Sequence, residues 1–461
     1  MSTNHSGAST ELAQSDRLRR WLCLWLAICG LSLLSSTHRL WLGSSEFPRV
    51  PFLRGLDVLN VLSDRWLCVA GLLAVPVLVD AVVRGDRRSS HAARLGHGAL
   101  LVLLVSIALL VLRDQHRLQP WLCHFVILTL ILARSRVSGI CRAFESPSLP
   151  TPLPGVPGRG EQDFADGSAR HESSSPLSRN LILVTASLYV WSAWSKLDVS
   201  FVTTYGQQLV EALLGSIGLS TRFWSPTSRT LAAAMLPIGE FVIAGLFLLG
   251  RTRRLGCVLS WVMHVALMLA VGPLGLNHLG GVLIWNVFFI GQNWLLFRAE
   301  RTTTPMLFAR PRDREAWLAL IVAVAPALRL LGWLDHWPAW AVYASGTERV
   351  SLLIHESAIA KLEPSLRACV EPSQWHPQWR YVRIERWSLE TVNAPIYPQD
   401  RFFVGVACAI AERAQLDWEL KLVWQSSANR MTGERQTLEY ADRTAIEELA
   451  TTYRCNARPA R

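Results

Sequence analysis

Long runs of apolar residues dominate this sequence of 461 residues and set the class of fold that it can adopt. Hydrophobic residues make up 51% of the chain, and only 18% are Asp, Glu, Lys or Arg, against about a quarter charged in soluble domains. A helix needs ~20 mostly apolar residues to cross a bilayer. Segments close to that length lie at about residues 21–36, 66–84, 97–113, 120–134, 179–195, 230–250, 255–274, 280–298 and 315–334. The sequence therefore predicts an all-α polytopic membrane protein with about nine transmembrane helices in a lipid bilayer.

The basic residues between these segments predict an orientation. Cytoplasmic loops of membrane proteins carry an excess of Lys and Arg. The N-terminus and the loops that alternate with it hold 21 Lys and Arg residues, whereas the opposite loops hold 9. We therefore expect a cytoplasmic N-terminus and, after an odd number of spans, an extracytoplasmic C-terminal segment. The formal net charge of +11 is then loop charge beside a membrane, and no nucleic-acid partner is expected.

Composition divides the chain into four parts. Residues 1–142 form a membrane half with four spans, and residues 179–334 form a second half with five. Residues 143–178 are rich in Pro, Ser and Gly, which predicts a disordered cytoplasmic linker. Residues 335–461 contain 15 basic and 16 acidic residues and no long apolar run, which predicts a small extracytoplasmic α+β domain. Within that domain, alternation predicts strands at 350–355, 381–384 and 418–424 and helices at 402–413 and 444–452.

The cysteines restrict the redox and metal chemistry that can be assigned. None of the nine cysteines forms a Cys-x-x-Cys pair, so neither a dithiol redox site nor a zinc ribbon is predicted, and no metal site is expected. Cys369 and Cys455 lie in the C-terminal domain and are candidates for a disulfide in an oxidising compartment. The alternative is that these two cysteines and Cys408 remain free thiols, with Cys408 buried in a helix.

Titratable residues inside apolar segments are the first candidates for function. A charged side chain at the centre of a membrane helix costs about 2.5–3.5 kcal/mol on insertion scales, and such residues often mark functional sites. Glu240 lies midway along segment 230–250, and His264 lies midway along the next segment. A tight turn joins the two segments, so the side chains could meet as a Glu–His pair. Such a pair would either handle protons or contact quinone, or it would serve only as an interhelical hydrogen bond.

A second candidate is Lys196, one of only three lysines in the chain, which ends segment 179–195. Lysine differs from arginine in that burial can convert it to a neutral base. One interpretation is therefore a general base at the end of a membrane helix, and the other is a lysine that pairs with Asp198 at the membrane surface. Asn286 is a further polar residue within an apolar segment and is expected to form a helix–helix hydrogen bond or a ligand contact.

Residues 179–299 resemble two related families of membrane proteins. The matching motifs are Lys196-Leu-Asp198, Tyr205-Gly206, and Pro237 and Glu240 followed by Leu248-Leu-Gly-Arg-Thr-Arg-Arg254. They resemble the DoxX/MauE-type redox-associated proteins and the horizontally transferred transmembrane domain related to the vitamin K-dependent carboxylase. The chain has no cysteine pair of the MauE kind and no full Asn-Asn-His-Tyr-like carboxylase motif.

The resemblance implies a bacterial inner-membrane protein. In the first hypothesis it assists redox or quinone-linked chemistry with a redox partner protein outside the cytoplasm, and quinone is the candidate cofactor. Lys196, Glu240 and His264 are then the catalytic candidates, and Trp194, Asp198 and Asn286 are the substrate or quinone contacts. In the second hypothesis the protein is a carboxylase-like enzyme, with Lys196 as the base that acts on a lipid-soluble substrate. The third hypothesis is a non-catalytic anchor that presents the C-terminal domain.

Overall fold

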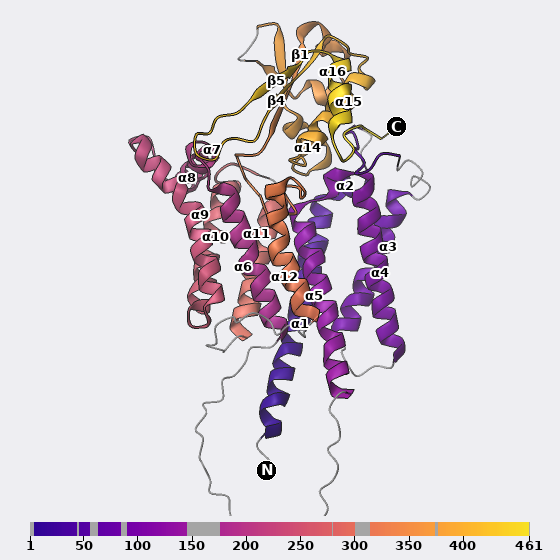
Figure 1. Cartoon of the computed structure of the whole chain (residues 1–461), viewed down its shortest axis with the longest axis vertical. Helices are drawn as coiled ribbons and strands as arrows, with labels where there is room; N and C mark the ends of the chain where they lie inside the picture. Colours follow the sequence, from indigo (N-terminus) through magenta and orange to yellow (C-terminus); the bar gives the residue numbers. More distant parts are fainter. Residues whose placement is uncertain are drawn as a thin grey trace, which may run out of the picture.

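The computed structural model describes residues 4–43, 46–55, 63–83, 90–144, 176–278, 280–299, 314–373 and 377–460. The chain is mostly helical, and a small domain with a β-sheet lies on one end of a bundle of long helices (Figure 1). The predicted linker, residues 143–178, lies almost wholly outside the described residues.

Every apolar segment that the sequence predicts as a span is helical. Among the described residues, six helices are long and apolar enough to cross a membrane. They belong to α1 (Asn4–Ser36), α3 (Asp64–Val83), α4 (Ser90–Arg113), α9 (Pro226–Leu248), α10 (Arg253–Val271) and α11 (Gly280–Ala299). The other three segments form α5 (Pro120–Phe144), α6 (Pro176–Lys196), and α12 (Arg314–Val324) with the 3₁₀ helix η5 (Ala325–Leu331). A membrane protein with several spans is therefore supported. Six of the nine predicted spans meet the criteria of length and composition among the described residues, and the other three are not confirmed as spans.

Helix α6 is less apolar than its neighbours α9, α10 and α11, and protein surrounds much of it. Fourteen of its 21 residues are buried, and it packs against α5, α9, α11 and α12. The indole Nε1 of Trp191 donates to the backbone oxygen of Ala323 at 2.8 Å, which ties α6 to α12. A helix that contacts protein on most sides does not need an apolar surface, since its polar groups find partners inside the bundle.

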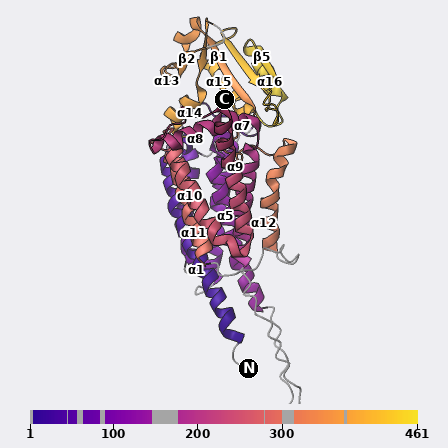
Figure 2. The same cartoon turned by 90° about the vertical axis from the view of Figure 1, so that its left-hand side faces the viewer.

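Helix α1 connects the two halves of the bundle. It packs against α3 and α5 on one side and against α11 on the other. The indole Nε1 of Trp25 donates to the backbone oxygen of Phe288 at 3.0 Å. A Cβ atom at Gly291 would lie 2.4 Å from the Trp25 ring, so glycine is required at this position for the close contact between α1 and α11. Figure 2 shows α10 and α11 on the side of the bundle opposite α12.

The C-terminal domain contains an antiparallel five-stranded sheet in the order β2-β3-β1-β4-β5. Its strands are β1 (Arg349–His355), β2 (Val370–Pro372), β3 (Trp379–Val382), β4 (Leu420–Gln425) and β5 (Thr437–Tyr440). Leu352 of the central strand lies opposite Val382 on one side and Leu422 on the other. The helices are η6 (Glu356–Lys361), α13 (Pro364–Arg367), α14 (Ile384–Val392), α15 (Asp400–Arg413) and α16 (Arg443–Thr452). The α+β prediction is confirmed, as are the strands predicted at 350–355 and 418–424 and both predicted helices. The strand predicted at 381–384 is displaced: β3 ends at Val382, and α14 begins at Ile384.

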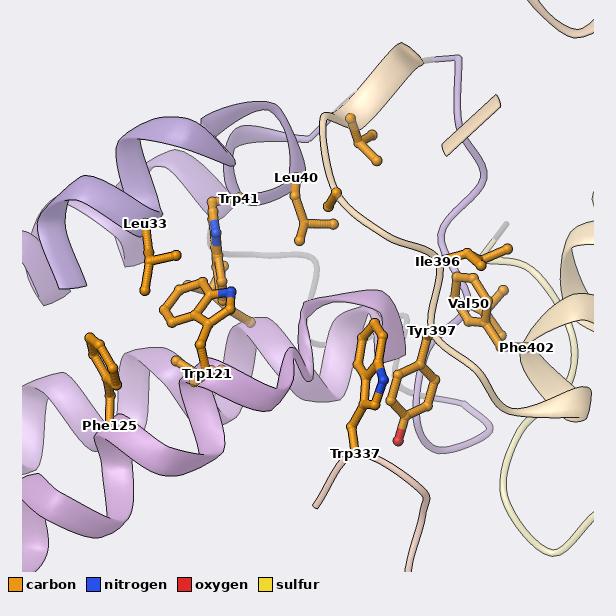
Figure 3. Close-up of a cluster of buried hydrophobic side chains, with 14 of the residues drawn as sticks. Leu33, Leu40, Trp41, Val50, Trp121, Phe125, Trp337, Ile396, Tyr397 and Phe402 are labelled. Atoms are coloured by element: carbon orange, nitrogen blue, oxygen red, sulfur yellow. The ribbon is translucent and has the colours of Figure 1, made fainter. Parts of the chain in front are cut away.

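Short helices connect the long helices of the bundle. They are α2 (His38–Leu42), η3 (Gln115–Arg117), α7 (Val199–Thr203), α8 (Tyr205–Ser216) and η4 (Gly250–Thr252), the last of which joins α9 to α10. Of these, α2, α7 and α8 lie at the end of the bundle nearest the domain (Figure 1). The domain and the bundle share one core, in which Val50 and Phe402 lie close to Tyr397 and Trp337 (Figure 3).

Buried polar groups hold the domain on the bundle. Arg401 forms an ion pair with Asp335, in which its Nη1 lies 2.8 Å from Oδ1, and it donates from Nε to Gln115 Oε1 at 2.8 Å. His116 Nε2 lies 3.0 Å from the backbone oxygen of Pro395. Because Gln115 and His116 belong to η3, these contacts join the loop between α4 and α5 to the domain.

The proposed disulfide is not formed. Cys369 and Cys455 are both free. The Cys369 thiol instead lies 3.6 Å from the backbone oxygen of Ser365 and 3.6 Å from Glu390 Oε2, inside the domain. The expectation that Cys408 is buried in a helix is confirmed, and it is also free. The structure therefore favours free thiols over the bridge.

Acid should weaken the attachment of the domain. Burial lowers the pKa of His116 from about 6.5 to about 4, with a smaller effect of the Arg117 charge. The unfolded chain therefore binds more protons between these values, and stability falls as the pH falls through this window. Burial alone would raise the pKa of Asp335, but Arg401 outweighs burial and lowers it, so its contribution is also lost in acid. Between pH 6.5 and 5 we expect a loss on the order of 2 kcal/mol from His116, measurable by thermal unfolding of the purified chain.

The matched variant is His116→Asn, which retains an N–H donor but does not titrate. Its stability should fall less steeply between pH 6.5 and 5 than that of the wild type. Equal pH slopes in the two proteins would contradict the assignment to His116.

Candidate functional site

Lys196 and Glu240 form an ion pair between α6 and α9. The ammonium nitrogen of Lys196 lies 2.8 Å from Glu240 Oε1, 3.1 Å from Oε2 and 2.6 Å from Ser192 Oγ. Ser192 is one turn earlier on α6, so the helix itself places it beside Lys196. Lys196 is 5% exposed. Each of the three ammonium protons therefore has an acceptor oxygen nearby, and the lysine is almost wholly buried.

The predicted pairing of Lys196 with Asp198 does not form. Asp198 is the N-cap of α7, and its Oδ1 accepts from the backbone N–H of Phe201 at 2.7 Å. The predicted pairing of Glu240 with His264 is also absent, since each has other partners. Glu240 lies beside the last two turns of α6, where Ser192 and Lys196 face it. A sequence shows which residues are polar and how deep they lie, but not which face of a helix meets which neighbour.

The C-terminal domain covers this end of α6. The guanidinium of Arg430 lies 4.8 Å from the centre of the Trp194 ring, and the backbone N–H of Val199 donates to the oxygen of Arg430 at 2.9 Å. A Cβ atom at Gly346 would lie 2.9 Å from Asp198 Oδ2, so the domain approaches the α6–α7 junction closely. Trp194 and Asp198 are therefore contacts between bundle and domain. Arg430 and Gly346 could not have been found from the sequence, because they are distant along the chain and carry no motif.

His264 belongs to a separate buried network that joins α6, α10 and α11. Its Nε2 lies 2.6 Å from the Tyr189 hydroxyl, and its Nδ1 lies 2.8 Å from Asn286 Oδ1. Asn286 donates from Nδ2 to the backbone oxygen of Val282 at 2.8 Å, which leaves its Oδ1 as the acceptor. A neutral His264 therefore donates from Nδ1 and accepts at Nε2 from the Tyr189 hydroxyl.

Asn293 of α11 adds a second hydrogen-bonded connection between this network and α10, through Ser260. Its Nδ2 donates to the Tyr189 hydroxyl at 3.1 Å and to Ser260 Oγ at 3.0 Å. Its Oδ1 is buried and has no hydrogen-bond partner among the described residues. Tyr189 and Asn293 are polar residues within apolar segments, so the criterion that selected Asn286 could also have selected them.

Aromatic rings enclose the network. Phe289 lies between two histidines, with its centroid 4.8 Å from His264 and 4.9 Å from His124. The His264 and Phe289 rings are nearly parallel, at 9°. The His264 network is enclosed, since Tyr189, His264, Asn286 and Asn293 are all buried. Glu240, in contrast, retains an exposed fraction of 15% of its side chain.

No protein family, curated protein or solved structure matches the chain in comparisons with known proteins. The site can therefore be interpreted only from its own geometry.

Double-mutant cycles should separate the two polar groups. We expect Lys196→Met and Glu240→Gln to be coupled by about 0.5–3 kcal/mol in stability, because each removes the partner of the other. Tyr189→Phe and His264→Leu should be coupled for the same reason. Glu240→Gln and His264→Leu should be coupled less strongly than either pair, because no hydrogen bond among the described residues joins Glu240 to His264. Denaturant or thermal unfolding in detergent measures all three cycles, and strong coupling in the last would show that the two groups act together.

Proposed function

We propose that the chain is a multi-pass protein of the bacterial inner membrane that supplies protons to a lipid-soluble acceptor of the quinone class, and so assists redox chemistry. The observation that carries the proposal is the Lys196–Glu240 pair, buried at its ammonium and partly exposed at its carboxylate. An ionised pair among membrane helices is costly to desolvate, and ionisable residues in such positions mark proton or substrate pathways.

The outer surface of α9 is suited to contact with a lipid-soluble molecule. Ile238 and Val242 are 42% and 48% exposed, and they lie on nearly the opposite face of α9 from Glu240, because two residues correspond to a rotation of about 200°. In a bilayer Ile238 and Val242 would face lipid, and a quinone would reach the carboxylate through the part of the Glu240 side chain that stays exposed, 15%. The electrons would come from a redox protein outside the cytoplasm. Reduction of a quinone to quinol takes up two electrons and two protons. The redox protein would supply both electrons, and the pair would pass on the two protons one after the other, each replaced from the aqueous phase.

The geometry favours a proton donor over the carboxylase-like base. A base needs a neutral amine whose lone pair faces the substrate. The nitrogen of Lys196 instead faces three oxygen atoms that accept from an ammonium group. The carboxylate of Glu240 balances the positive charge of Lys196. After Lys196 has given its proton to the acceptor, Glu240 can receive the replacement proton. The Tyr189–His264 network is enclosed and is assigned a structural role beside the pair.

The proposed orientation places the pair near the extracytoplasmic surface. The excess of Lys and Arg in alternate loops supports a cytoplasmic N-terminus. Nine spans, three of them the more polar or shorter α5, α6 and α12, would then leave the C-terminal domain outside. Its position over α6 would allow a redox partner to dock close to the pair. The relationship to DoxX/MauE-type proteins rests on the short motifs around Lys196 and Glu240.

A topology reporter tests this orientation. Alkaline phosphatase, which folds only outside the cytoplasm, should be active when fused after Arg461. A fluorescent protein that matures only in the cytoplasm should be dark at the same position. The reverse pattern would contradict both the nine-span topology and an extracytoplasmic redox partner.

Replacing Lys196 by Arg tests proton donation. The purified wild type in liposomes should retain quinone and accelerate its reduction by an external reductant. Arg keeps the positive charge but does not release its proton. Lys196→Arg should therefore retain quinone and lower the rate by about 100-fold or more, the size of a general-acid contribution.

Lys361→Arg is the matched control, because Lys361 is an exposed lysine that pairs with Glu419 in the C-terminal domain, away from the bundle. It should leave the rate unchanged. A fully active Lys196→Arg protein would reduce the pair to an electrostatic anchor. A wild type that neither retains quinone nor accelerates its reduction would overturn the proposal.

A further inference from the structure

An apolar cavity of about 350 Å³ lies between α1, α3, α4 and α5 in the N-terminal half. Figure 1 shows α3 and α4 as a hairpin beside α1 and α5. Nearly all of the lining side chains are aliphatic or aromatic. Leu31 of α1 and Leu72 of α3 line the cavity and are each 43% exposed, so the cavity opens at the apolar flank of the bundle. Its volume lies within the range of about 300–1,000 Å³ found for small-molecule sites.

Two tryptophans close the end of this cavity that lies nearest the C-terminal domain. Trp41 of α2 and Trp121 of α5 both line it, and their rings meet edge to face with centroids 5.8 Å apart (Figure 3). The Cys68 thiol donates to the backbone oxygen of Trp41 at 3.5 Å. Aromatic side chains of this kind gather where a bilayer changes from hydrocarbon to headgroups. The closed end therefore has the character of a membrane interface.

Three arginines surround one carboxylate directly beside that end. Asp64 accepts from Arg113 at 2.9 Å and from Arg117 at 2.6 Å, and it lies 3.0 Å from Arg49. Arg117 also donates to the backbone oxygen of Leu110 at 3.2 Å, and Leu110 lines the cavity. The cluster is thus connected to the cavity wall by a hydrogen bond.

The cluster carries more positive than negative charge. Asp114 is a second carboxyl group whose charge interacts with Arg117 and Arg49, and it caps η3 by accepting from the backbone N–H of His116 at 3.1 Å. In the contacts of the described residues, three guanidinium groups therefore face the two carboxyl groups of Asp64 and Asp114. Arg113 and Arg117 are buried, whereas the side chain of Arg49 is 39% exposed. Arg49 can contact a ligand, and the two buried arginines position Asp64 and maintain the positive potential.

We propose that this cavity and the arginine cluster form a binding site for an anionic phospholipid. One acyl chain would occupy the cavity between α1, α3, α4 and α5, and the phosphate-bearing headgroup would lie against Arg49. The charge complements the headgroup and the apolar wall complements the chain. A soluble phosphate would leave the cavity unused, and an uncharged lipid would give the partly exposed guanidinium of Arg49 no anion besides Asp64. The site is separate from the Lys196–Glu240 pair and does not depend on the proposed function.

Native mass spectrometry of the full chain in detergent tests the proposal. The protein is titrated with phosphatidylglycerol and, separately, with phosphatidylcholine of the same acyl chains. Phosphatidylglycerol should bind about fivefold more tightly, the effect of one partly exposed ion pair. Inorganic phosphate at the same concentrations should not bind. Equal affinity for the two lipids, or equal binding of phosphate alone, would overturn the proposal.

Two variants with matched controls locate the site. Arg49→Gln should abolish the preference for phosphatidylglycerol, whereas Arg222→Gln, at an exposed arginine of the other half, should retain it. Ala27→Phe places a ring in the cavity and should lower the affinity for both lipids by at least fivefold. Leu101→Phe, on a lipid-facing position of α4 that is 63% exposed, should not. Unchanged binding in both Arg49→Gln and Ala27→Phe would place the lipid elsewhere.

Discussion

The structure depends on one constraint, which is that polar groups within a membrane must find their partners inside the protein. The helices α6, α9, α10 and α11 satisfy it through contacts between side chains. Lys196 and Glu240 pair across α6 and α9, while Tyr189, His264 and Asn286 form hydrogen bonds across α6, α10 and α11. Each contact also fixes the rotation of one helix against the next. Helix α6, in which 14 of 21 residues are buried, takes part in both sets.

The same constraint explains how the C-terminal domain is attached. The ends of the bundle helices are connected by η3 and α7, whose polar residues would otherwise be left beside the membrane surface. Arg401 reaches Gln115 of η3, and the backbone oxygen of Arg430 accepts from the first residue of α7. The domain is therefore part of the folded bundle rather than a tethered module. This argues against a simple anchor, because the domain also covers the end of α6 that carries Lys196.

The two halves of the bundle differ in the balance of positive and negative side chains that lie beside their apolar residues. In the C-terminal half a single lysine and a single carboxylate are balanced, which is an arrangement suited to exchanging protons. In the N-terminal half Asp64 is outnumbered by Arg49, Arg113 and Arg117, which is an arrangement suited to holding an anion. The proposed proton transfer and the proposed lipid site follow from this difference.

The sequence by itself determined the helical class, the position of every apolar helix and the separate α+β domain. Hydrophobic length and strand alternation are local properties, so they can be read without a fold. It also identified Lys196, Glu240, His264 and Asn286 as unusual, since polar residues in apolar segments stand out. From the sequence, Lys196 was expected to pair with Asp198 and Glu240 with His264, whereas Lys196 and Glu240 pair with each other. A disulfide was also expected between Cys369 and Cys455, which are free in the structure. Only the tertiary structure decided that Lys196 meets Glu240 and that Arg430 covers Trp194, because such contacts depend on the rotation and packing of helices that are distant in the chain.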